Sequence, residues 1–402
     1  MPVVQVPPEI LRIGHPAPVS VRDAAGHLLL AKGVLIASEE QRSRLVARAI
    51  YVDELDGDLL NRALAGKLDS MLRQNARLGQ IAQARVDGAV IATGTPGSKE
   101  SVDPTVAWAN LQMRGRVLLQ DPAPADFLPR LLKLQREVLD LVEADADAAL
   151  LILVQATTSD AHHYSVFHSL LVAVLCELAA RQLPSFTPAW RDSLRCAALT
   201  MNMAMTALQD QLALQEEAPS TRQRAMIDKH AARGAACLRE AGVADALWLE
   251  AVEHHHTTSA GPLAAQSPGL QLARLLQRAD IFSARLSMRR ARPALAASAA
   301  VKAAYLDEHQ QADEAGKAII QTTGIYPPGS YVRLGNGEVA VVLRRGPHAK
   351  APKVASIVSK SGTVLVEPVV RDTRVNPHDV TGGVAPHEVR VRLNMERLLK
   401  LA

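Results

Sequence analysis

Histidines are concentrated in one part of this chain. Seven of the thirteen lie between positions 162 and 256, and they are His162, His163, His168, His230, His254, His255 and His256. A lone helical histidine is usually a surface residue or a hydrogen-bonded core residue. Neutral imidazole is, however, the commonest metal ligand in proteins, and helical bundles build metal centres by gathering such side chains on facing helices. The cluster therefore favours a metal centre over seven unrelated histidines.

The order and spacing of these residues resemble the HD-GYP domain, a branch of the HD superfamily of metal-dependent phosphohydrolases that cleaves cyclic di-GMP. The likeness covers about residues 125–300 and rests on short segments at 164–169, 195–202, 228–234, 251–256 and 279–284. The resemblance implies that His230, His254 and His255 form the histidine set of one metal site. It also implies that His168 and Asp280 are the remnant of a second site.

The sequence departs from the family pattern at the pair that names the superfamily. Met201 and Asn202 stand where the family has its His-Asp pair, which supplies a ligand and a bridging carboxylate. A thioether does not bind a hard divalent metal, and an asparagine offers at best a neutral carbonyl. Ala204 and Met205 replace the family's Gly-Lys, and the loop at 257–263 lacks Gly-Tyr-Pro. We therefore expect a degenerate site with one divalent metal (Fe, Mn or Zn) or none.

Three arginines follow the aspartate helix, where the family has basic residues near phosphate. Arg289, Arg290 and Arg292 are thus candidate contacts for a phosphate group, although a basic run of this kind is more often a solvated helix end. The ligands that the resemblance implies are cyclic di-GMP or another cyclic nucleotide. Other signalling proteins are the remaining class of partner.

Two classes of function remain open. The first is a cyclic di-GMP phosphodiesterase-like signalling protein that is catalytically impaired, because a missing bridge removes both nucleophile positioning and transition-state charge stabilisation. The second is a non-catalytic scaffold that binds a nucleotide or a protein without metal. A metal-free preparation that binds nucleotide would favour the second class.

The elements that must position these residues are mainly α-helical. Apolar residues recur at three- and four-residue spacing from about 105 to 321, which predicts an HD-type helical bundle. A small α/β module is expected at 1–60, and a polar helix with a linker at 61–104. The turn at 335–337 between apolar runs predicts a hairpin within a small β module at 325–372. Residues 373–402 are expected to form a weakly ordered tail with a short helix at 395–401.

Composition narrows the class of protein further. The 45 basic and 41 acidic residues are interspersed and aromatic residues make up 3% of the chain, so we expect no nucleic-acid-binding face. No run approaches the length of a membrane span. Cys176, Cys196 and Cys237 have no metal-binding or redox spacing, which favours reduced core residues. These features predict a soluble cytoplasmic protein of two or three domains.

Overall fold

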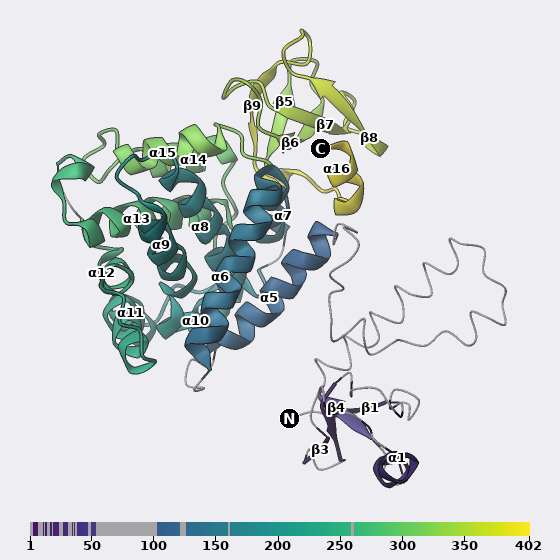
Figure 1. Cartoon of the computed structure of the whole chain (residues 1–402). Coiled ribbons are helices and arrows are strands. Elements are labelled where there is room, and N and C mark those ends of the chain that lie inside the picture. Colours follow the sequence, from purple (N-terminus) through teal and green to yellow (C-terminus); the bar gives the residue numbers. More distant parts are fainter. Residues whose placement is uncertain are drawn as a thin grey trace, which may run out of the picture. The chain divides into compact units, whose positions relative to one another are not determined.

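The computed structural model in Figure 1 describes parts of residues 3–53, and residues 103–402 apart from 121–125, 160 and 259–260. The chain divides into two compact units, residues 1–101 and 102–402, and each is described by itself. The polar helix expected at 61–85 lies outside the described residues, and so does the linker at 86–104 except for its last two positions. Within the described residues, no helix has the length and apolarity needed to cross a membrane.

The first unit contains a small antiparallel sheet and one helix. Its elements are β1 (Val3–Gln5), β2 (Val21–Arg22), β3 (Leu28–Leu30), α1 (Glu39–Val46) and β4 (Tyr51–Asp53), with strand order β1-β4-β2-β3. A compact apolar cluster that includes Val19, Val21, Ile36, Ile50 and Val52 lies beneath the sheet. These elements fall where the sequence predicts a small α/β module.

The second unit is mainly α-helical, as predicted. Its helices are α5 (Pro104–Gln120), α6 (Phe127–Ala144), α7 (Ala146–Ser159), α8 (Tyr164–Ala180), α9 (Pro188–Thr200), α10 (Thr206–Leu214), α11 (Thr221–Glu240), α12 (Ala246–His254), α13 (Pro268–Leu286), α14 (Ala297–Tyr305) and α15 (Glu314–Thr323). Short 3-10 turns, η2 (Met203–Met205) and η3 (Leu263–Ala265), join two pairs of them.

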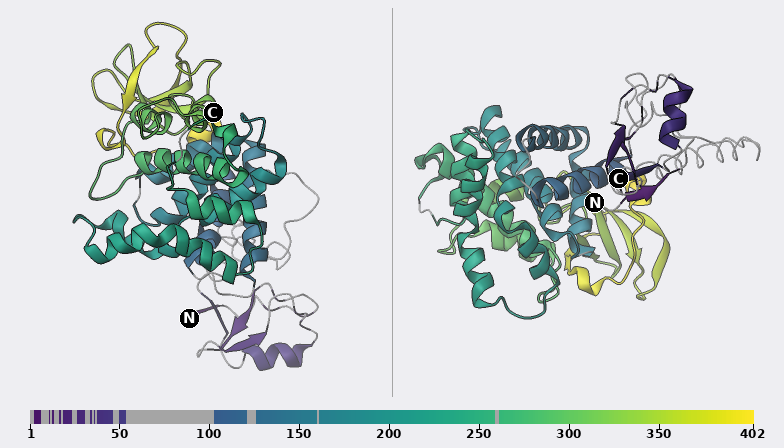
Figure 2. Two further views of the ribbon diagram at one scale, coloured as in Figure 1. Left: turned by 90° about the vertical axis from the view of Figure 1, so that its left-hand side faces the viewer. Right: turned by 90° about the horizontal axis from the view of Figure 1, so that it is seen from below.

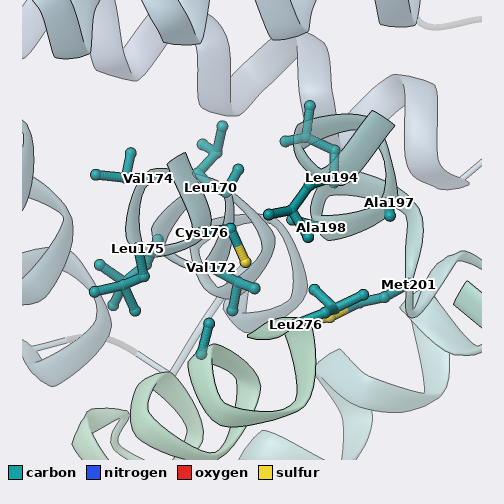
Figure 3. Packing of buried hydrophobic residues seen from close by; sticks show 14 of the residues in the cluster. Leu170, Val172, Val174, Leu175, Cys176, Leu194, Ala197, Ala198, Met201 and Leu276 are labelled. Carbon is teal, nitrogen blue, oxygen red and sulfur yellow. The ribbon is translucent and has the colours of Figure 1, made fainter. Parts of the chain in front are cut away.

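Helix α8 forms the centre of the bundle. All of its residues except Phe167 are buried, because neighbouring helices cover it on every side. A helix that is apolar around its whole circumference requires such a position. Figure 3 shows the apolar cluster in which Val172 of α8, Leu194 of α9 and Leu276 of α13 take part. The central helix thereby fixes α13, which carries Asp280.

Side-chain caps fix the starts of the helices that carry the candidate site. Ser220 forms a capping box with Gln223 at the start of α11. Asp245 accepts a hydrogen bond from the backbone N–H of Trp248 at the start of α12, and Ser267 does the same for Leu270 in α13. Such caps each stabilise a helix by about 1 kcal/mol and define its first turn. The site residues therefore lie on helices with well-defined starts.

A five-stranded antiparallel sheet follows the bundle, in the order β8-β7-β6-β5-β9. Its strands are β5 (Tyr331–Leu334), β6 (Val339–Arg344), β7 (Lys353–Val358), β8 (Val364–Asp372) and β9 (Val380–Val384). The hairpin of β5 and β6 is the one that the turn at 335–337 predicts. The sequence predicts a weakly ordered tail at residues 373–402, but these residues include β9, which pairs with β5 as an edge strand of the sheet. Helix α16 (Met395–Leu401), which coincides with the expected short helix, packs on the same module.

The β module lies against α7 (Figure 1 and Figure 2). Arg344 and Arg345 of the module pair with Asp145 and Asp147 at the start of that helix. Gly329 adopts φ +89°, and an added Cβ there would lie 2.9 Å from the carbonyl oxygen of Leu151. Only glycine allows the backbone to adopt this conformation so close to the helix without strain.

Candidate metal centre

Three imidazoles meet where α11 faces the end of α12. His230 lies on α11, and His255 and His256 follow the last residue of α12. Their ligand atoms all lie within 4.8 Å of one another. The rings of His230 and His255 are buried, whereas His256 is exposed. One side of the cluster is thus closed by the protein and the other side is open to a ligand.

The hydrogen bonds of the two buried rings determine which nitrogen carries the proton. Nδ1 of His230 donates to the carbonyl oxygen of Ile227, and Nδ1 of His255 donates to that of Val252 at 2.7 Å. In a neutral imidazole the other nitrogen then carries a lone pair and no proton. The two Nε2 atoms lie 3.3 Å apart, so two lone pairs point at the same small space.

This separation fits a shared metal ion. Two nitrogens that each lie about 2.0–2.1 Å from a tetrahedral zinc ion are about 3.3 Å apart. The backbone carbonyls act as the outer-shell acceptors that metal-ligating histidines usually have. The residues therefore suit one divalent metal bound by His230, His255 and His256, with a fourth position open.

Burial keeps both inner histidines neutral. It lowers the pKa of His230 below the usual value, although the hydrogen bond to Ile227 opposes the shift. Burial, together with the neighbouring His256, lowers the pKa of His255 to about 3. Both rings therefore keep their lone pairs available at neutral pH, which metal binding requires.

The structure places His254 outside this cluster. His254 ends α12, and its Nδ1 lies 3.3 Å from the hydroxyl of Thr257. The buried residues Trp248 and Val252 show which face of α12 points inward. His255 lies seven residues after Trp248 and His256 lies four after Val252, so helical periodicity points to these two rather than to His254. His256 is the residue that the sequence analysis missed.

The other two predicted metal ligands, His168 and Asp280, are hydrogen-bonded to each other. Nε2 of His168 lies 2.8 Å from a carboxylate oxygen of Asp280, and its Nδ1 lies 2.9 Å from the hydroxyl of Ser283. His168 is fully buried. Burial alone would raise the pKa of Asp280, but the hydrogen bond and charge of His168 hold it below its usual range. This half of the site is an internally satisfied pair.

The two residues at the position of the family's His-Asp pair, Met201 and Asn202, follow the end of α9. Met201 is fully buried at the end of α9, in the apolar cluster that also contains Val172 and Leu276 (Figure 3). Asn202 is 9% exposed, and its carbonyl oxygen accepts the backbone N–H of Met205 as the chain turns into η2. The sulfur therefore serves the packing of the core.

A cavity of about 600 Å³ adjoins Asp280 between α13 and α14. Its positively charged lining consists of Arg278, Arg285, Arg289, Arg292 and Lys302. The structure thus brings two of the three predicted arginines, Arg289 and Arg292, to this cavity. Arg290 instead lies 3.8 Å from Glu216 at the surface.

The cations of the cavity repel one another. Burial lowers the pKa of Arg292, and the positive charges of Arg289 and Arg285 lower it further. Among the described residues, none of these three arginines forms an ion pair with a carboxylate. Asp280, Asp307 and Glu308 also line the cavity, so its five cations exceed its carboxylates by two. An excess of positive charge suits the cavity to an anion.

Comparisons with known proteins agree with the resemblance. No protein-family model matches the chain. Over 257 residues it is 28% identical to the cyclic di-GMP phosphodiesterase PA4108 of Pseudomonas aeruginosa, which covers 62% of this chain and 61% of that protein. The chain thus spans about three fifths of the length of this relative. The sequence likeness agrees with the predicted resemblance to cyclic di-GMP phosphodiesterases.

Among solved structures, the chain is similar to Bd1817, an HDG"Y"P protein from Bdellovibrio bacteriovorus. The match has 14% sequence identity and a TM-score of 0.45, and it covers 79% of this chain and 98% of that one.

Proposed function

We propose that this chain is a cyclic di-GMP-binding signalling protein that holds one divalent metal and hydrolyses the nucleotide very slowly or not at all. The observation that carries the proposal is a difference in hydrogen bonding between the two halves of the site. His230 and His255 point two lone pairs at one space, whereas His168 and Asp280 bind each other.

The metal would be held by His230, His255 and His256. Iron, manganese and zinc are all compatible with imidazole ligands, and zinc fits the nitrogen separation best. When bound, such an ion polarises a phosphoryl oxygen and makes water more acidic. The exposed side of His256 leaves room for a ligand to reach it.

The cavity beside Asp280 is the proposed place for the nucleotide. Arg289 and Arg292 would contact its phosphate oxygens, because guanidinium groups bind phosphate through paired N–H donors. Asp280 remains anionic at the edge of the cavity. A carboxylate in this position repels a phosphate that approaches too closely, so it limits how the ligand can lie.

Slow turnover follows from the ligands that are missing. Two-metal sites stabilise both the attacking and the leaving oxygen of an in-line displacement. Met201 offers no such ligand because it packs in the core, and Asp280 already has His168 as its partner. Binding without efficient hydrolysis suits a receptor for the nucleotide, and the cytoplasm is the location that the sequence predicts for it.

The test combines metal analysis, nucleotide binding and hydrolysis on the same purified protein. We expect one metal per chain after growth with added Zn²⁺, Mn²⁺ or Fe²⁺, and loss of that metal in His255→Ala. Calorimetry should detect cyclic di-GMP binding, and chromatography should detect no product above the protein-free control. Product formation that disappears in His255→Ala would refute the impairment. Metal-free protein that binds nucleotide would identify a non-catalytic scaffold instead.

A further inference from the structure

Tyr164 lies between the His168–Asp280 pair and the basic cavity. It is the first residue of α8 and is 3% exposed. Its ring stacks on His168, with centroids 5.3 Å apart and planes inclined by 15°. The guanidinium carbon of Arg289 lies 4.6 Å from the centre of the same ring. One aromatic side chain therefore contacts both regions.

Arg289 is also hydrogen-bonded to this tyrosine. A terminal nitrogen of Arg289 donates to the phenolic oxygen of Tyr164 at 2.5 Å. Nε of Arg289 is buried and, among the described residues, has no hydrogen-bond partner. Since buried polar groups are usually satisfied, this N–H is an unpartnered donor on a side chain that lines the cavity.

The backbone on both sides of Arg289 is anchored. The N–H of Met288 donates to the carbonyl of Thr157 in α7, and the N–H of Arg290 donates to that of Ala213 near the end of α10. Arg289 and Arg292 also exchange backbone hydrogen bonds across a tight turn. With the backbone held in this way, the contact with Tyr164 decides where the guanidinium of Arg289 lies.

The chemistry of the partner matters. A carboxylate beside Arg289 would neutralise its charge, whereas a phenol ring and hydroxyl hold the guanidinium and leave the charge in place. Holding a long, flexible side chain before a ligand arrives reduces the entropy lost on binding. Tyr164 therefore holds Arg289 in place before an anion binds and leaves the positive charge of the guanidinium uncompensated.

We propose that Tyr164 is a positioning residue for anion binding, which holds Arg289 in the lining of the cavity so that it meets a phosphate oxygen of the ligand. The inference rests on the proposed function for the ligand itself. It adds a residue on α8 to a site whose cations come from α13, α14 and the turn between them.

The experiment measures the affinity of the metal-loaded protein for cyclic di-GMP, and for inorganic phosphate as a minimal probe. Tyr164→Phe keeps the ring and removes the hydroxyl, so we expect affinity for cyclic di-GMP to fall about threefold to tenfold. Tyr164→Leu removes the ring as well and should weaken binding about tenfold to a hundredfold. Metal content should stay the same in both variants.

Two comparisons separate positioning from a general structural role. In an Arg289→Ala background, Tyr164→Phe should cause no further loss of affinity, because the group that it positions is gone. Tyr331→Phe is the matched control, since this buried hydroxyl also has one side-chain partner, Gln155, and does not line the cavity. That variant should bind cyclic di-GMP like the wild type.

The outcomes are distinguishable. If the wild type binds neither probe, the proposed function fails and this inference fails with it. If the wild type binds cyclic di-GMP and Tyr164→Phe binds it equally well, the positioning role alone is refuted. A loss in Tyr164→Phe that adds fully to the loss in Arg289→Ala would also refute it. Tyr164→Phe decides the question even if Tyr164→Leu does not fold.

Discussion

The histidine cluster makes a sharp prediction about which ring holds the metal. The sequence resemblance implies a set that contains His254, whereas the structure gathers His230, His255 and His256. Replacing His256 with alanine should therefore weaken metal binding, and replacing its neighbour His254 should not. The two substitutions remove the same type of side chain from positions only two residues apart, so each is the natural control for the other.

The size of the effect can be estimated from the ligand count. Structural zinc sites with four protein ligands bind with about 10–16 kcal/mol, which is roughly 2.5–4 kcal/mol for each ligand. Loss of one ligand then weakens binding by about 60-fold to 700-fold. The exposed His256 should lie at the lower end of this range, and the buried His255 should lie higher.

The assay is a competition for Zn²⁺ between the protein and a chromophoric chelator at pH 7.5. We expect wild type and His254→Ala to compete equally, and His256→Ala to lose about two orders of magnitude in affinity. Thermal unfolding provides a second measurement, since a metal that binds only the folded state raises the melting temperature. A loss in His254→Ala with normal binding in His256→Ala would refute the geometry of the site.

Three further predictions concern stability. The pKa of Glu338 is lowered to about 2, first of all by its arginine partner. Above its unfolded pKa, ionised Glu338 should therefore stabilise the fold by on the order of 2–3 kcal/mol, and this stabilisation should be lost as the pH falls towards 2. Urea unfolding should show a steeper decline for the wild type than for Glu338→Gln, because other carboxylates such as Asp280 also have lowered pKa values, and an equally steep decline in the variant would contradict the prediction. Glu177→Ala should cost about 3 kcal/mol because Arg195 loses its buried carboxylate partner and keeps only Gln135 and the exposed Asp192, whereas the exposed Glu396→Ala should cost less than about 1 kcal/mol. Met201→Leu should cost under about 1.5 kcal/mol and leave the metal content unchanged, and loss of metal would mean that the thioether is a ligand.

Much of the fold is visible in the sequence because it depends on local patterns. The apolar spacing of 105–321 predicts the bundle, and the glycines around Asn336 predict the hairpin. Strand β9 escapes such reasoning because its partner, β5, lies more than forty residues earlier in the chain. With Gly382 and Gly383 in its middle, the strand also lacks the side chains that identify a strand from its sequence.

The candidate site could be predicted only in part from the sequence, for a related reason. The order of the histidines identifies the helices that face each other, but spacing does not state which ring of 254–256 turns inward. The inward faces of Trp248 and Val252 settle that in the structure. The role of Tyr164 has no sequence signal at all, since it depends on a contact between residues 125 positions apart.

The two halves of the site differ in whether their polar groups can satisfy each other without a metal. When a bridging ligand is lost, a neighbouring imidazole and carboxylate can satisfy each other, and His168 and Asp280 do so with a direct hydrogen bond. Nothing in that half then requires a metal. His230 and His255 cannot satisfy each other, because each donates its one ring N–H to a backbone carbonyl and only lone pairs remain between them. Either a cation or an added proton must relieve that contact, and burial opposes the proton. The side of the site with His230 and His255 therefore favours a bound cation, whereas the His168–Asp280 pair does not require one.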